Sequence, residues 1–277
     1  MQDTILSRII ILTSSVNRRW CEREVMPEKF NAARRVRNIL STARAQNEHG
    51  NTLSAWGTTF QILDVPNYQF ETFRLLKLLM EQVDNLAREV EGFGLDVSDY
   101  HLTFNNLKSI LMVTNLDNPW QVYKRSITDE VIRQLGLFAQ WSQTDEPVVP
   151  VEDMELLKQD LLNFQDEVMR SDLDERLKAL VSKQINIILR ALREYPIRGA
   201  EAIKDGDADF LGTIVSEYEF VREHKEAEVV QKTISFRERM RELVSWMNFG
   251  INLSRWVTSG EAQKMLEAGS DVIDKLP

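Results

Sequence analysis

Two neighbouring stretches with helical periodicity constrain the fold of this chain more than any other feature. Residues 151–170 place an apolar side chain every third or fourth position, the spacing that lines one face of a helix, and residues 172–195 repeat that pattern. Pro196 predicts that the second helix ends at Tyr195. Because a short link between two long helices favours antiparallel packing, we predict a helical hairpin over 151–195.

The rest of the chain also shows mainly helical patterns. Apolar residues at helical spacing predict helices over 28–46, 68–91, 128–141, 210–232 and 235–256. Between 197 and 204 we expect a short helix, which the sequence Asp205-Gly206-Asp207 would end in a turn. Residues 53–65 are mixed in character, and their partly alternating pattern suggests a minor short β element or a packed loop. We therefore predict an all-α, multi-helix bundle in two helical lobes.

The stretch from Ser142 to Pro150 is the expected boundary between the lobes. It is polar and contains two prolines, which favour an extended path over a helix. We predict an N-terminal helical lobe with a basic head over 1–143, and a C-terminal acidic helical bundle over 151–277 built on the hairpin. A chain of 277 residues, 43% of them hydrophobic, can bury one large or two ordinary cores.

Charge is unevenly distributed along the sequence. Residues 1–50 hold nine basic against five acidic residues, whereas residues 145–180 hold eleven acidic against four basic ones. The formal net charge of −9 argues against nucleic-acid binding by the whole surface. Two interpretations remain: the basic head and the acidic segment attract each other within the fold or across a dimer, or residues 18–44 bind phosphate groups of a nucleic acid through Arg34, Arg35 and Arg37.

The sequence contains few signals of catalysis, cofactor binding or membrane insertion. A glycine-rich phosphate loop, a nucleophile elbow and a paired-histidine metal motif are all missing, so we expect no cofactor and no metal. The single cysteine, Cys21, excludes an internal disulfide and a cysteine-based zinc site. No segment reaches about 18 apolar residues without charges. We therefore expect a cytoplasmic protein without membrane contact.

One short spacing resembles a known catalytic motif. Arg44 and His49 are separated by four residues at the end of the basic helix predicted over 28–46. This arrangement is similar to the Arg-x4-His signature of HEPN-type helical ribonucleases, small α-bundles that often act as toxins or antiphage effectors. The resemblance implies that Arg44 and His49 lie beside an RNA phosphate and assist attack by a 2′-hydroxyl, without a metal, while neighbouring arginines steer the substrate.

Most of the sequence is typical of a helical interaction protein. We expect a non-enzymatic protein–protein interaction module, or a regulatory or accessory subunit, with a protein partner or self-association. The alternatives are the metal-independent ribonuclease that uses Arg44 and His49, and a nucleic-acid-binding module that uses the N-terminal arginines. An enzyme needs its two residues in one cleft, a nucleic-acid module needs an uncompensated arginine face, and an interaction protein needs an exposed docking surface.

Overall fold

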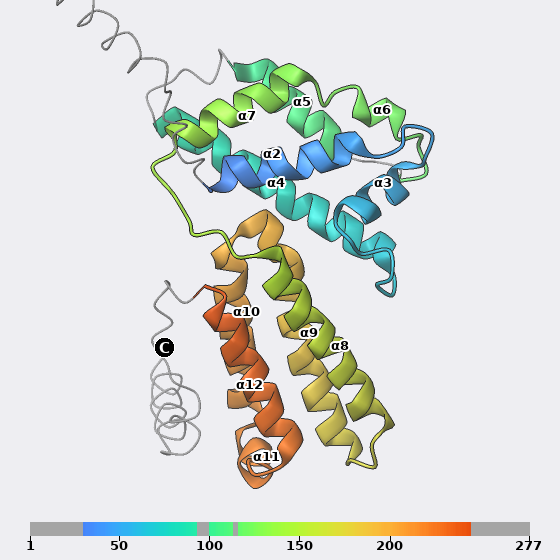
Figure 1. Ribbon diagram of the computed structural model, residues 1–277, viewed down its shortest axis with the longest axis vertical. Coiled ribbons are helices and arrows are strands. Elements are labelled where there is room, and N and C mark those ends of the chain that lie inside the picture. Colours follow the sequence, from blue (N-terminus) through green and yellow to red (C-terminus); the bar gives the residue numbers. More distant parts are fainter. Residues whose placement is uncertain (1–29, 93–99, 113–115, 245–277) are drawn as a thin grey trace, which may run out of the picture.

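The computed structural model describes residues 30–92, 100–112 and 116–244 and confirms the all-α fold. Within these ranges the chain forms eleven helices and no β-strand. Figure 1 shows two groups of helices, with α2–α7 above and α8–α12 below, joined by the extended linker 142–150 and by the upper end of α9. None of these helices is both long enough and apolar enough to cross a membrane.

The first group packs around α2 and α4. Its helices are α2 (Ala32–Ala45), α3 (Thr52–Thr59), α4 (Tyr68–Gly92), α5 (His101–Leu111), α6 (Gln121–Lys124) and α7 (Asp129–Trp141). Asn31 caps α2 by accepting from the backbone N–H of Arg34, and its amide donates to the carbonyl of Ala139 at 2.8 Å. The cap thus positions α2 and also fixes the end of α7.

The second group is built on the predicted hairpin, which the structure confirms. Its helices are α8 (Val151–Arg170), α9 (Glu175–Arg198), α10 (Ala200–Ser216), α11 (Tyr218–Glu223) and α12 (Glu228–Glu242). Helix α9 is central and packs against α8, α10 and α12. Asp174 caps it by accepting from the backbone N–H groups of Arg176 and Leu177.

The buried apolar side chains form two clusters that correspond to the two groups of helices. The exception is Ile197, which belongs to α9 but is fully buried in the cluster formed by α2–α7. The last turn of α9 therefore packs into the apolar core of the first group of helices. The division of the chain into domains 1–143 and 151–277 stays a prediction, because burial does not show that either part folds by itself.

The suggested β element near 53–65 is wrong. Residues 52–59 form α3, whose first turn is capped by the Asn51 side chain accepting from the N–H of Ser54 at 2.8 Å. Trp56 is fully buried one helical turn after Thr52 and Leu53. In the described ranges the one isolated β-bridge joins Asn51 to Pro119, just before the helix. A good N-cap and burial at helical spacing outweigh the partial alternation of the segment.

Three helix boundaries in the second group differ from the prediction. Helix α9 continues through Pro196 to Arg198, because a proline in the last turn removes a single hydrogen bond, and the N–H of Gly199 still donates to Tyr195 at 2.8 Å. The predicted turn at 205–207 lies in the middle of α10. The single helix predicted over 210–232 is interrupted at Glu217, between α10 and α11, and again at residues 224–227, before α12 begins at Glu228.

Candidate docking groove

The solvent-facing side of α9 carries a row of polar and basic residues. The apolar side of this helix packs against its neighbours, and the opposite side leaves a stripe of exposed or half-buried residues at spacings of three and four. The stripe consists of Ala179, Lys183, Asn186, Arg190 and Arg193. A helix with such a stripe at the centre of a bundle presents polar and basic groups between two flanking helices.

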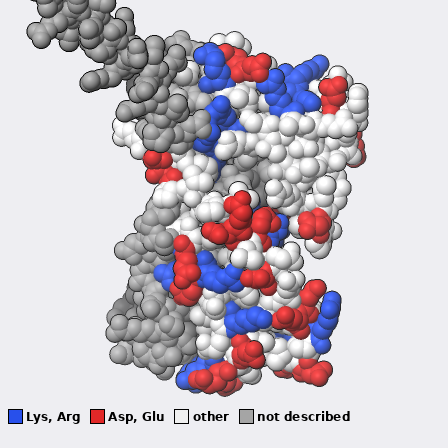
Figure 2. Space-filling view, in the orientation of Figure 1, with Lys and Arg blue, Asp and Glu red and all other residues white. Residues whose placement is uncertain are grey.

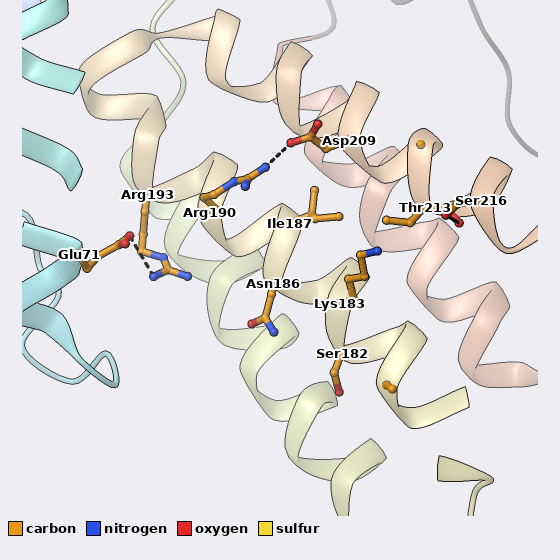
Figure 3. Close-up of a pocket in the computed structure, with 12 residues that line it drawn as sticks. Glu71, Ser182, Lys183, Asn186, Ile187, Arg190, Arg193, Asp209, Thr213 and Ser216 are labelled. Carbon is orange, nitrogen blue, oxygen red and sulfur yellow. Dashed lines mark hydrogen bonds and ion pairs between the residues drawn. The ribbon is translucent and has the colours of Figure 1, made fainter. Parts of the chain in front are cut away.

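A groove of about 870 Å³ lies along this stripe, between α9 and α10. Figure 3 shows that Lys183, Asn186 and Arg190 come from α9, that Asp209 and Thr213 come from α10, and that Glu71 approaches from α4 at the far end. Small side chains line much of the rest of the groove: Ala179, Ser182, Gly212 and Ser216. A methyl group at Gly212 would meet no atom within 4 Å, so the wall is low and open there.

The cations of the groove differ in how far they are neutralised. Arg190 pairs with Asp209, and the Nη1 of Arg193 lies 3.3 Å from Oε1 of Glu71. Lys183 is exposed and makes no ion pair with any residue that the structure describes. The middle of the groove therefore keeps an uncompensated positive charge.

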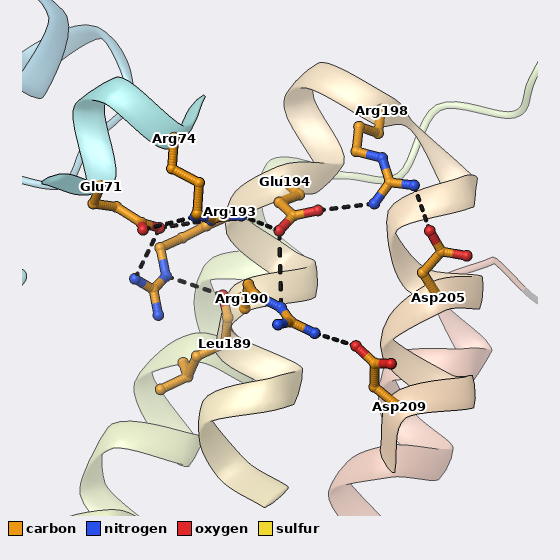
Figure 4. A network of polar contacts seen from close by, with 9 residues as sticks. All are labelled: Glu71, Arg74, Leu189, Arg190, Arg193, Glu194, Arg198, Asp205 and Asp209. Atoms are coloured by element: carbon orange, nitrogen blue, oxygen red, sulfur yellow. Dashed lines mark hydrogen bonds and ion pairs between the residues drawn. The ribbon is translucent and has the colours of Figure 1, made fainter. Parts of the chain in front are cut away.

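The end of the groove is fixed by an ionic network between the two groups of helices. Glu71 of α4 accepts from Nε and Nη2 of Arg74 at 2.8 and 2.7 Å, and Arg74 also pairs with Glu194 of α9. Figure 4 shows the network continuing through Arg198 to Asp205 of α10. The hydrogen bonds from Arg74 hold the pKa of Glu71 below its ordinary value. The network thus ties α4 to both walls of the groove.

A second polar contact between the two groups centres on Arg35. Its side chain is 4% exposed, and its Nε donates to the carbonyl of Ile197 at 3.1 Å while Nη1 lies 2.9 Å from Oε1 of Glu146. The other oxygen of Glu146 accepts from the backbone N–H of Ala200, the first residue of α10. The acidic linker and the basic head therefore attract each other within the fold at this point, which is one of the two interpretations of the charge pattern.

This contact gives Arg35 a structural role, although the sequence pattern groups it with two other arginines. Arg34 and Arg37 lie half-buried on α2, and the guanidinium of Arg37 lies over Gly136 of α7. On the face shown in Figure 2, basic side chains alternate with acidic ones and do not gather into a continuous basic surface. Nucleic-acid binding through residues 18–44 stays a prediction, and residues 18–29 lie outside the described ranges.

The structure places Arg44 and His49 on separate segments. Arg44 is in the last turn of α2 and pairs with Asp129 of α7 at 2.5 Å. His49 lies in the loop after the helix, with its side chain 85% exposed, and its Nε2 is 3.9 Å from a carboxylate oxygen of Glu48. The catalytic roles that the HEPN resemblance implies stay a prediction.

Comparison with known proteins identifies no relative. The chain matches no protein-family model, no curated protein and no solved structure. Within the described ranges, no group of three or more His, Cys, Asp and Glu side chains is arranged to hold a metal ion. The function must therefore be argued from the groove itself.

Sequence reasoning missed the groove because its residues look like an ordinary solvated helix face. Lys183 and Arg190 are seven residues apart, two helical turns, and Arg193 continues the same stripe. This basic periodicity within 172–195 is a signal that could have been found. The involvement of Glu71 could not have been found in this way, since Glu71 lies more than 100 residues from this stripe in sequence.

Proposed function

We propose that the chain is a helical protein-interaction module, acting as a regulatory or accessory subunit, and that it binds a segment of a partner protein in the groove between α9 and α10. The observation that supports this proposal is the groove itself, about 870 Å³ in volume and open to solvent. A groove between two packed helices suits the docking of a further helix.

The walls of the groove favour close approach of another backbone. Ala179, Ser182 and Gly212 carry small side chains or none, and Ile187 offers an apolar contact on the α9 side. Asn186 and Ser216 supply hydrogen-bonding groups. Apolar contact together with polar groups is the pattern found in protein interfaces.

Site-directed photo-crosslinking tests the proposal. A photoreactive amino acid replaces Asn186 in the groove or, as a control, Gln159 on the exposed side of α8, so that Lys183 is kept in both variants. Both full-length variants are irradiated in a lysate of the source cells, and crosslinked proteins are identified by mass spectrometry. We expect one or more proteins that crosslink from position 186 and not from 159. The same products from both positions, or none from position 186, would contradict the proposal.

The ribonuclease alternative makes a different prediction. If Arg44 and His49 act together on RNA, the purified chain cleaves total RNA in EDTA and the His49→Ala variant does not. Equal cleavage by both proteins, or no cleavage by either, would exclude Arg44 and His49 as a catalytic pair. This assay is independent of the crosslinking experiment, because neither residue lines the groove.

A further inference from the structure

We infer, on the basis of the function proposed above, that the occupant of the groove is an acidic amphipathic helix of a partner protein. The inference rests on three features of the groove: its shape, the small residues in its walls and its unbalanced charge.

The shape fits about four turns of helix. Helices α9 and α10 run antiparallel on either side of the groove, since Arg198 faces Asp205 and Arg190 faces Asp209. The stripe from Ala179 to Arg193 is about 21 Å long at the helical rise of about 1.5 Å per residue. Small residues at 179, 182, 212 and 216 let a third helix approach to the usual interaxial distance of about 8–10 Å.

The charge of the groove selects for carboxylates. Lys183 has no acidic partner in the described part of the chain, so a carboxylate placed beside it gains an ion pair without breaking an existing one. The two carboxylates that line the groove, Glu71 and Asp209, are already engaged by arginines. A basic helix would have to compete for these carboxylates and would place its cations next to Lys183.

The arginines of the groove keep donors for a ligand. Among the described residues, contacts of Arg193 use Nε and Nη1 and none uses Nη2. Contacts of Arg190 with the same part of the chain use Nε and Nη2 and none uses Nη1. Because guanidinium groups present five N–H donors, each arginine can donate to a ligand carboxylate in addition to its present partner. Lys183 and Arg190 are two helical turns apart, so a partner helix with acidic residues at i and i+7 matches both.

The preference of the groove for acidic segments runs against the net charge of the whole protein. The formal net charge of the chain is −9, which favours basic partners at long range. An acidic segment that still binds must therefore be recognised by short-range contacts in the groove. Such binding weakens as ionic strength rises, because the contacting charges are partly exposed to solvent.

Fluorescence anisotropy with two designed probes tests the inference on the full-length chain. The first probe is a labelled 18-residue helical peptide with alanine and leucine on one face and glutamates at positions i and i+7. The second probe is the same peptide with lysines in place of these glutamates. The variants are Lys183→Glu, in the groove, and Lys77→Glu, the same change at an exposed site on α4.

We expect saturable binding of the glutamate peptide only, weakened at least about tenfold by Lys183→Glu and less than about twofold by Lys77→Glu. Equal binding of the two peptides, absence of saturable binding, or no effect of Lys183→Glu would overturn the inference. Circular dichroism of both variants checks that they are folded. The two proposals can be told apart: if position 186 crosslinks a partner but Lys183→Glu has no effect here, the proposed function stands and the inference fails, because the groove then binds a segment of other chemistry.

Discussion

Replacement of Gly199 by alanine should be among the most damaging single methyl additions in this chain. Gly199 joins α9 to α10 with φ +65° and ψ −149°, a region that is essentially restricted to glycine and costs another residue about 1–3 kcal/mol. The added Cβ would also overlap Oε2 of Glu146 and lie 2.5 Å from Nη1 of Arg35. The ion pair must therefore separate or the backbone must move.

The magnitude follows from the burial of Arg35. Separating this guanidinium from its carboxylate leaves a buried charge without its partner, which typically costs about 3–5 kcal/mol. The two costs are not additive, since a backbone shift relieves both, and the lower entropy of the unfolded alanine chain offsets about 0.4–1 kcal/mol. We expect a net loss of at least about 3 kcal/mol in the free energy of unfolding.

Urea denaturation followed by circular dichroism measures this loss, and Gly212→Ala is the matched control. Gly212 is inside α10, and a Cβ there meets no atom within 4 Å. Because alanine has a higher helix propensity than glycine, the free energy of unfolding of that variant should rise by about 0.5–1 kcal/mol. A Gly199→Ala variant within about 1 kcal/mol of the wild type, or equal losses at the two positions, would refute the reasoning.

Three further predictions concern the remaining polar contacts. Arg74 lowers the pKa of Glu71, so the stabilisation from the ionised carboxylate is complete above the unfolded-state pKa near 4.5 and is lost as the pH falls through the folded-state pKa. The difference in unfolding free energy between wild type and Glu71→Gln should therefore shrink on acidification. A difference that stays constant with pH would contradict this. Arg237→Met should cost about 3–5 kcal/mol in thermal or urea unfolding, because it leaves the buried Asp207 with only the more distant Arg241, at 3.9 Å, and adding Asp207→Leu should recover at least half of that loss. Total RNA incubated in EDTA should show no cleavage that depends on His49, since the proposed function involves no catalysis.

The fold class and the hairpin could be predicted because they depend on local periodicity. Apolar residues at helical spacing in 151–170 and 172–195 specify two faces that can be buried only against other elements, and a short link makes them neighbours. The linker is likewise a local property, since its prolines and polar residues disfavour a helix. None of these features requires knowledge of distant segments.

The turn predicted at 205–207 shows where local reasoning stops. Asp205-Gly206-Asp207 has the composition of a turn, yet it lies within α10 because each residue has a tertiary partner. Asp205 pairs with Arg198, Asp207 pairs with the fully buried Arg237, and Gly206 packs so closely on Ala191 that a Cβ there would lie 2.6 Å from the alanine methyl. Glycine is thus required for close helix packing rather than for a turn, a distinction that sequence alone does not carry.

The candidate site depends on distant segments in the same way. Glu71 and Arg193 are separated by more than 100 residues, yet their ion pair belongs both to the groove and to the contact between the two groups of helices. If the proposed acidic segment binds, its carboxylate at Arg193 would lie next to Glu71 and repel it, which would weaken the link to α4. The proposal therefore implies that binding in the groove and the contact between the two groups of helices are coupled through one guanidinium, and by linkage a change that loosens this contact would also change the affinity of the groove.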